Sequence, residues 1–300
     1  MIKEYIFQVN GKEFTLGPKT WIMGVLNVTP DSFSDGGQYL DKDKAVKRGL
    51  RLIEEGSDII DIGGESTRPG SEPIPAEEEI RRVIPVIKSL REKTEALISV
   101  DTTKSEVARA ALDAGADIIN DISSLRFDPG MAPLAAEKGV PVILMHMKGM
   151  PKTMQVNPCY EDVLQEVRSF LQERIHEAQA AGIKRERIVI DPGIGFGKRL
   201  EDNLALINKL HVLGELDRPI LIGTSRKSFI GNILDLPPQE RLEGSIASSI
   251  LSMAHGAHIL RVHDVAAIKR AVLVAEAIMN ETNSPGFASE KVEKKSSHAL

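Results

Sequence analysis

Short apolar runs that end in a polar side chain recur eight times along this chain of 300 residues. The polar ends are Asn27, Asp61, Asp101, Asn120 with Asp121, His146, Asp191, Ser225 and Arg261. If the runs are the parallel strands of one closed barrel, these groups all lie at one rim, where a (β/α)8 enzyme holds its chemistry. The pattern therefore predicts both a fold and the place of its site.

The segments between these runs have helical periodicity. Apolar residues at helical spacing include Val46, Leu50 and Ile53, and a second such set begins at Leu204. Strands that alternate with helices are typical of βαβ units and a parallel sheet. We therefore predict an α/β fold of the (β/α)8 TIM-barrel class, with residues 1–280 as a single domain. Residues 281–300 are polar and aperiodic, which predicts a disordered tail.

Two local sequence signals predict a turn and the ends of a helix. The stretch YIFQVNGKEFTLG alternates around Asn10-Gly11, which predicts a β-hairpin that closes the lower end of the barrel. Thr103 and Glu106 have the spacing of a capping box, so a helix is expected to begin there and to stop at Gly115.

Composition narrows the classes of function. The formal charge of −5 argues against a general nucleic-acid or anionic-membrane surface, although it leaves room for a local anion pocket. A single cysteine, Cys159, excludes an internal disulfide and a cysteine-based zinc cluster. No apolar run approaches the roughly 20 residues that span a bilayer, and the chain starts without a secretion signal. We expect a cytoplasmic protein that binds neither nucleic acid nor membrane.

Four polar residues from different strand ends are suited to a flat heterocycle. Asp101, Asn120, Asp191 and Lys227 would meet at the barrel mouth. A carboxylate accepts hydrogen bonds from adjacent N–H groups of an amino-amidine edge, while amide and ammonium groups bind carbonyl and ring nitrogen atoms. The alternative is that each acid only pairs with a cation at the rim, which is less plausible for the whole set than for one member.

A second group predicts an anion pocket. Arg261 and His263 are two residues apart, so on an extended strand end they face the same side. With Asn27 and Thr67 they could bind a phosphate or diphosphate, with Mg²⁺ bridging Asn27 and phosphate oxygens. The competing interpretation is a structural His263 that bonds to a backbone carbonyl.

Other signals point to function less directly. The long polar segments after the first two strands, 27–41 and 63–78, favour loops that cover a substrate over simple connectors. His255, His258 and His263 resemble a metal cluster, but Gly256 is expected to separate their faces. The glycines of GIGFGK, Gly193 to Lys198, fit neither a dinucleotide fingerprint nor a phosphate loop. Cys159 has no placed base, which argues against a nucleophile.

Several motifs in order carry a resemblance to a known family. They are MGVLNVTPDSFSDGG, DIGGESTRPGS, SVDTTKSEVA, ADIINDIS, HMKGMPKTMQ, DPGIGFGK, GTSRKSF and RVHDV, spread between about Trp21 and Met279. With these motifs the chain closely resembles the dihydropteroate synthases. The resemblance implies a (β/α)8 barrel that joins 6-hydroxymethyl-7,8-dihydropterin diphosphate to 4-aminobenzoate, forming 7,8-dihydropteroate and diphosphate. It also implies Mg²⁺ and a target of sulfonamides, which mimic 4-aminobenzoate. Separately, apolar residues on the last two predicted helices could serve a homodimer as readily as the barrel; they include Ile246, Ile250, Met253, Ile268 and Val272.

The same resemblance assigns roles to individual residues. It implies catalytic roles for Lys227, Arg261 and Asp101. The matched pterin and diphosphate positions are Thr67, Asp101, Asn120, Ile122, Met145, Asp191, Gly195, Phe196, Lys227, Arg261 and His263. The matched 4-aminobenzoate positions are Phe33, Arg68, Pro69 and Ser228, and Asn27 matches the metal ligand.

Two alternatives belong to other classes. A cobalamin-dependent pterin-binding methyltransferase domain resembles this barrel, but it has no need of the DSFSDGG and STRPGS loops and works with a corrinoid-binding partner. A non-catalytic pterin-binding protein would be expected to have lost anion or loop residues, yet Asn27, Thr67, Lys227, Arg261 and His263 are all present.

Overall fold

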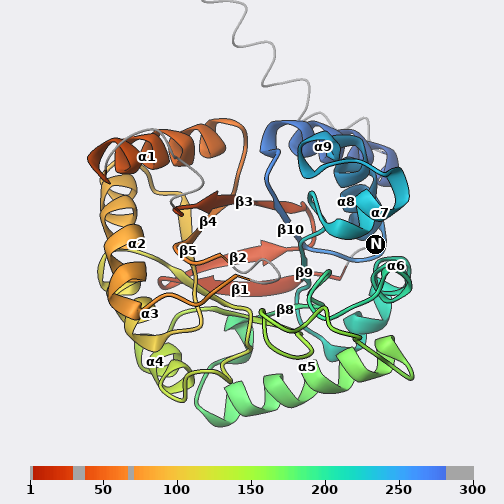
Figure 1. Cartoon of the computed structure of the whole chain (residues 1–300), viewed down its shortest axis with the longest axis horizontal. Helices are drawn as coiled ribbons and strands as arrows, with labels where there is room; N and C mark the ends of the chain where they lie inside the picture. Colours follow the sequence, from red (N-terminus) through yellow and green to blue (C-terminus); the bar gives the residue numbers. More distant parts are fainter. Residues whose placement is uncertain (1–2, 30–37, 67–70, 282–300) are drawn as a thin grey trace, which may run out of the picture.

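An eight-stranded parallel sheet curls into a barrel, and helices surround it (Figure 1). The computed structural model describes residues 3–29, 38–66 and 71–281. In spatial order the sheet contains β8 (Ile188–Asp191), β7 (Val142–Met145), β6 (Ile118–Asp121), β5 (Leu97–Asp101), β4 (Ile59–Gly63), β3 (Trp21–Asn27), β10 (Ile259–Val262) and β9 (Leu221–Ile222). The predicted fold class is confirmed.

Helices follow the strands along the chain and form the outer layer. They include α1 (Gln38–Glu54), α2 (Ala76–Arg91), α3 (Ser105–Asp113), α4 (Met131–Lys138), α5 (Val163–Ala180), α6 (Leu200–Asn208), α7 (Ser228–Leu234), α8 (Leu242–Ala254) and α9 (Val265–Met279). In α2 the fully buried Val83, Ile87 and Leu90 face the barrel. Since the helices cover the outside of the sheet, the strands are buried on both faces, which explains their continuous apolar runs.

The amino end of the barrel is closed by a β-hairpin. Strands β1 (Tyr5–Val9) and β2 (Lys12–Leu16) pair across Asn10 and Gly11, which both have positive φ, 50° and 73°. Such a turn suits this dipeptide. Side chains of the hairpin pack on residues near the starts of the barrel strands in one cluster that contains Phe7, Val9, Leu16, Met23, Ile59, Ile118, Ile143, Val189, Leu221 and Ile259. The prediction of a plug is confirmed, and the carboxyl end is the end left for a site.

Of all neighbouring strands in the barrel, β8 and β9 are paired at the fewest positions. A single isolated bridge links Ile190 to Ile220, and the Ile190 amide donates to the Pro219 carbonyl at 3.0 Å. By contrast, β3 and β4 are paired over five positions, from Met23 with Ile59 to Asn27 with Gly63.

The predicted capping box at Thr103 is wrong. The N-cap residue of α3 is Lys104, and its side chain makes no capping hydrogen bond. Instead, the carboxylate of Asp128 accepts from the Ser105 amide at 2.6 Å. The expected end is confirmed, because α3 stops at Asp113 and Gly115 follows with a φ of 108°.

Some predicted features lie outside the described residues. These are most of the loop after β3, residues 67–70 of the loop after β4, and the polar tail apart from Glu281. Within the described residues, no helix has the length and apolarity to cross a membrane.

Candidate active site at the carboxyl end of the barrel

Three polar or charged side chains and one glycine lie at the same level on adjacent strands. In the parallel register Asn27 pairs with Gly63, Gly63 with Asp101, and Asp101 with Asn120. A side chain at Gly63 would fill the space between its neighbours, because its Cβ would lie 3.7 Å from Asp101 Oδ2 and 3.9 Å from Asn27 Oδ1. The glycine therefore leaves room between the amide of Asn27 and the carboxylate of Asp101.

A guanidinium from β10 bridges two carboxylates of this region. Arg261 Nε donates to Asp61 Oδ2 and Arg261 Nη2 donates to Asp101 Oδ2, each at 2.7 Å. Asp61 is fully buried in β4 and also accepts from Asn120 Nδ2 at 3.1 Å. The other oxygen of Asp61, Oδ1, is buried and has no hydrogen-bond partner among the described residues. Asp61 thus connects Arg261 to Asn120.

The environment of Asp101 disfavours its charge. Burial raises the pKa of Asp101 to about 7, with Asp61, Glu79 and Asp121 adding to the shift and Arg261 opposing it. The same carboxylates, Asp61 and Asp101, raise the pKa of Arg261 despite its burial. The guanidinium is therefore the fixed positive charge of the site, whereas Asp101 can exchange a proton near neutral pH.

Asp191 and Lys227 face the same space from β8 and from the loop after β9. Burial raises the pKa of Asp191 to about 6, while the Gly193 amide, which donates to Asp191 Oδ1 at 2.7 Å, and the charges of Lys227 and Arg261 lower it. Burial, together with Arg261, lowers the pKa of Lys227 to about 8. Lys227 and Arg261 lower the pKa of Asp191, and Asp191 raises that of both, so the charge of Asp191 lies close enough to interact with each.

A cluster of apolar side chains lies beside these charges. Ile122, Met145 and Phe196 belong to a small cluster, separate from the main core, that also contains Met147 and Met154. The Lys227 ammonium lies 4.2 Å from the centroid of the Phe196 ring, a cation–π contact. Gly195 is next to that ring, and a Cβ there would lie 3.3 Å from Cδ of Lys227. The residues expected to pack on a flat ring are thus brought together.

His263 follows β10 and contacts a serine. Its Nδ1 lies 3.1 Å from Ser225 Oγ, and its backbone N–H donates to the same oxygen at 3.3 Å. Burial, helped by Arg261, Arg226 and Lys227, lowers the pKa of His263 to about 3. The histidine is neutral at physiological pH, and its partner is a hydroxyl, not the backbone carbonyl of the competing interpretation.

Of the remaining predicted site residues, only Ser228 lies among the described residues. Phe33, Thr67, Arg68 and Pro69 lie outside the described residues. Ser228 is exposed at the first position of α7, directly after Lys227. Asp61 was not predicted as a site residue, although its place in the run DIID, two residues before Gly63 on the same face of β4, was a usable signal.

The other two histidines of the apparent cluster each have a backbone partner. His255 Nδ1 lies 3.0 Å from the Ile207 carbonyl, while His258 Nδ1 accepts from the Ile220 amide at 3.1 Å. The described residues hold no group of three or more histidine, cysteine or acidic side chains that could bind a metal ion.

Comparisons with known proteins show the family of this chain. Residues 23–263 match the model of a family described as pterin binding enzyme. The chain is 49% identical to the dihydropteroate synthase of Escherichia coli strain K12 over 259 residues, which cover 86% of this chain and 92% of the relative. This chain belongs to the dihydropteroate synthase family.

Solved structures of dihydropteroate synthases share the architecture. The Xanthomonas albilineans enzyme with 4-aminobenzoic acid aligns with a TM-score of 0.86 at 49% identity, over 92% of this chain and 99% of that one. The same enzyme in complex with 7,8-dihydropteroate aligns with a TM-score of 0.80 at 48% identity, over 88% and 96% of the two chains. The activity is that of a dihydropteroate synthase, a transferase, and neither alternative class is needed.

Proposed function

We propose that the rim site condenses 6-hydroxymethyl-7,8-dihydropterin diphosphate with 4-aminobenzoate and releases 7,8-dihydropteroate and diphosphate. The observation that carries this proposal is the convergence of Asp101, Asn120, Asp191 and Lys227 around Arg261 at the open end of the barrel. Two ligands of the Xanthomonas albilineans enzyme, 4-aminobenzoic acid and 7,8-dihydropteroate, are the amine substrate and the product of this reaction.

The pterin ring is recognised by charge-assisted hydrogen bonds. Asp191 accepts from the amino-amidine edge, while Asn120 and Lys227 bind the ring nitrogens and the carbonyl. Ile122, Met145, Gly195 and Phe196 pack near the ring. One charge-assisted hydrogen bond contributes about 1.5–3 kcal/mol, which is enough to distinguish one ring system from an isostere.

The chemistry requires charge stabilisation and no covalent enzyme intermediate. The bond between the pterin methylene carbon and the diphosphate oxygen breaks, and the cation left on the carbon is delocalised into the ring. The arylamine nitrogen then forms the new C–N bond and loses a proton. Asp101 and Asp191 supply negative potential around the ring, while Arg261 stabilises the departing anion.

The diphosphate is held by Arg261, His263 and Thr67, with Asn27 at the end of β3. The donor set fits Mg²⁺, because Asn27 offers one amide oxygen beside the space left by Gly63, and Mg²⁺ takes its other ligands from phosphate oxygens and water. When bound, the ion neutralises charge on the leaving diphosphate. Phe33, Arg68, Pro69 and Ser228 form the 4-aminobenzoate subsite in this proposal.

We further propose that the chain forms a homodimer through a groove on α6, α7 and α8. The groove has a volume of about 610 Å³, and it is lined by apolar side chains that include the exposed Leu204, Ile233, Leu234 and Leu251. The sequence suggested other residues, Ile246, Ile250, Met253, Ile268 and Val272, as able to serve either a dimer or the barrel. Of these, Met253, Ile268 and Val272 are buried in the chain's own core. A single domain over residues 1–280 and a cytoplasmic location remain predictions from the sequence.

Purified protein incubated with Mg²⁺, the pterin diphosphate and 4-aminobenzoate tests the proposal when both products are followed. We expect 7,8-dihydropteroate and diphosphate in equal amounts, and a reaction without the amine separates synthesis from simple diphosphate loss. Asp191→Asn should abolish synthesis, whereas Asp113→Asn, a change on the exposed surface of α3, serves as the control. Wild-type kinetics in Asp191→Asn would contradict the proposed ring recognition.

A further inference from the structure

A buried lysine lies next to residues of the proposed pterin site and has no role in the chemistry described above. Lys198 ends the segment GIGFGK between β8 and α6 and is 3% exposed. Its ammonium lies 2.8 Å from His146 Nδ1, and it donates to the carbonyls of Gly193 at 2.9 Å and Phe196 at 3.1 Å. A buried ammonium is normally paired with a carboxylate, yet these hydrogen-bond partners are neutral. Burial accordingly lowers the pKa of Lys198 to about 7, while the charge of the nearby Asp191 opposes the shift.

The two carbonyls held by Lys198 bracket a turn that faces the pocket. At one end of the turn the Gly193 amide donates to Asp191 Oδ1. At the other end, the ring of Phe196 lies under the Lys227 ammonium, and Gly195 abuts the side chain of the same lysine. Lys198 therefore holds two carbonyls of a segment that includes Phe196 and contacts both Asp191 and Lys227.

His146 links this turn to the preceding strand. It follows β7 directly after Met145, and burial together with the charge of Lys198 lowers its pKa to about 2. The imidazole is therefore neutral, and with Nδ1 accepting from the ammonium its proton lies on Nε2. The ring packs edge-on against Phe170, with a centroid distance of 4.8 Å. These contacts give the ammonium a fixed acceptor.

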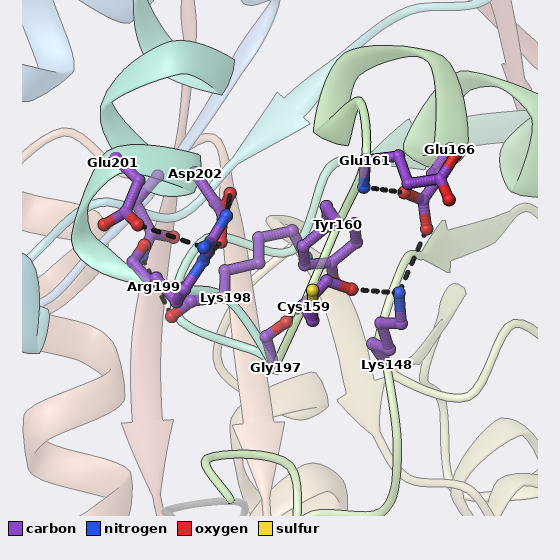
Figure 2. A network of polar contacts seen from close by, with 11 residues as sticks. Lys148, Cys159, Tyr160, Glu161, Glu166, Gly197, Lys198, Arg199, Glu201 and Asp202 are labelled. Atoms are coloured by element: carbon purple, nitrogen blue, oxygen red, sulfur yellow. Dashed lines mark hydrogen bonds and ion pairs between the residues drawn. The ribbon is translucent and has the colours of Figure 1, made fainter. Parts of the chain in front are cut away.

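The loops after β7 and β8 are in close backbone contact. A Cβ on Gly193 would lie 2.0 Å from the His146 carbonyl oxygen, and a Cβ on Gly197 would lie 2.3 Å from that of Lys148. Tyr160 Oη donates to the Gly197 carbonyl at 2.7 Å, and Figure 2 shows this region with Lys198 and Lys148 on either side of the tyrosine. Lys148 makes its own contacts, with Glu166 at 3.0 Å and with the Cys159 carbonyl.

We propose that Lys198 is a positioning residue for the pterin site, which acts through His146 Nδ1 and the carbonyls of Gly193 and Phe196 to fix the wall that presents Asp191, Phe196 and Lys227. The inference rests on the proposed function, because it assigns the pterin, and not 4-aminobenzoate, to this wall. Loss of the ammonium leaves buried acceptors unpaired, so the turn shifts and the pterin side of the site loosens.

The test compares Michaelis constants for the two substrates. In Lys198→Met we expect the KM for the pterin diphosphate to rise about tenfold, which corresponds to the loss of about one buried hydrogen bond. The KM for 4-aminobenzoate, measured with saturating pterin diphosphate, should change less than about twofold by the same reasoning. The matched control is Lys148→Met, which removes a neighbouring lysine from the same loops and should leave both constants unchanged.

A second pair of variants tests the positioning role of Lys198 if Lys198→Met does not fold. His146→Asn keeps an acceptor near the position of Nδ1, whereas His146→Leu removes it, and both lose the ring. The inference predicts a higher KM for the pterin diphosphate in the leucine variant than in the asparagine variant. Equal constants in the two His146 variants, or equal rises for both substrates in Lys198→Met, would overturn it. If the wild type forms no dihydropteroate, the proposed function itself is wrong; wild-type turnover with an unaffected Lys198→Met refutes only the positioning role.

Discussion

Arg261 Nε lies 2.7 Å from Asp61 Oδ2, so a guanidinium of the proposed anion pocket is held by a carboxylate that is fully buried in β4. Because Asp61 also accepts from Asn120, it sets the positions of one group for the diphosphate and one for the ring. We expect Asp61→Asn to lower kcat/KM for the pterin diphosphate about 100-fold, the loss typical of a displacement of about 1 Å in an active site. Steady-state kinetics with Asp113→Asn as the surface control checks this, and an unchanged kcat/KM would remove Asp61 from the site.

Replacing Arg261 by lysine separates the two halves of the substrate. The change keeps a cation but loses the planar fork that binds two oxygens at once. We expect binding of the pterin diphosphate to weaken about tenfold more than binding of 6-hydroxymethyl-7,8-dihydropterin, which lacks the anion. Calorimetric titration with both ligands measures the difference. Equal losses for the two ligands would argue against an anion-binding role.

The affinity for the ring should depend on pH near neutrality. The pKa of Asp101 is raised to about 7 and that of Asp191 to about 6, chiefly by burial. Each carboxyl contributes to ring binding in its ionised form, Asp191 as a hydrogen-bond acceptor and Asp101 through its negative charge. That form predominates above the pKa of the group and is lost as the pH falls through it. Titration with 6-hydroxymethyl-7,8-dihydropterin should therefore show affinity that rises from pH 5 to about pH 8, above which Lys227, whose pKa is lowered to about 8, loses its charge. A flat profile across this range would show that the carboxylates do not bind the ring as anions.

The close contact between the loops after β7 and β8 predicts a large difference between two glycine substitutions. Gly193 and Gly11 have similar φ values, +67° and +73°, so alanine at either carries the strain of about 1–2 kcal/mol for a left-handed residue. Only at Gly193 does the added Cβ meet a neighbour, the His146 carbonyl, at 2.0 Å. We expect Gly193→Ala to lower the free energy of unfolding by about 1–3 kcal/mol more than Gly11→Ala. Denaturant unfolding of both variants tests this, and equal losses would refute the steric argument.

The proposed homodimer can be tested by charge insertion into the groove on α6, α7 and α8. Leu251, 52% exposed, lies in that groove, whereas Val274, 61% exposed, lies on α9 outside its lining. Leu251→Arg should give particles of the 32.8 kDa monomer mass by light scattering, because a buried unpaired charge opposes association. Val274→Arg should keep twice that mass. A dimer that survives Leu251→Arg would place the interface elsewhere.

The sequence was sufficient for the barrel and for most of its rim. Parallel strands covered by helices leave long apolar runs, and the polar residue that ends each run marks the carboxyl end, which is how Asn27, Asp101 and Asp191 were found. The hairpin turn at Asn10 and Gly11 was equally readable, because positive φ at both positions favours this dipeptide.

The contacts that were missed depend on residues far apart in the chain. The start of α3 is held by Asp128, 23 positions after Ser105, so the local capping pattern at Thr103 gave the wrong answer. No motif predicts the contacts of Lys198, since two of its partners are backbone carbonyls, which every residue carries. The sequence alone does not distinguish Asp61 from other acidic residues in strands; its contacts with Arg261 and Asn120 give it a place in the site.

The single bridge between Ile190 and Ile220 gives the barrel one place where its wall can widen. Asp191 ends the strand on one side of this seam, and Lys227 follows the strand on the other. A small separation there changes the gap between these two side chains and leaves the ladders of the other strand pairs intact. Opening this seam would therefore break fewer backbone hydrogen bonds than separating any other pair of neighbouring strands in the ring.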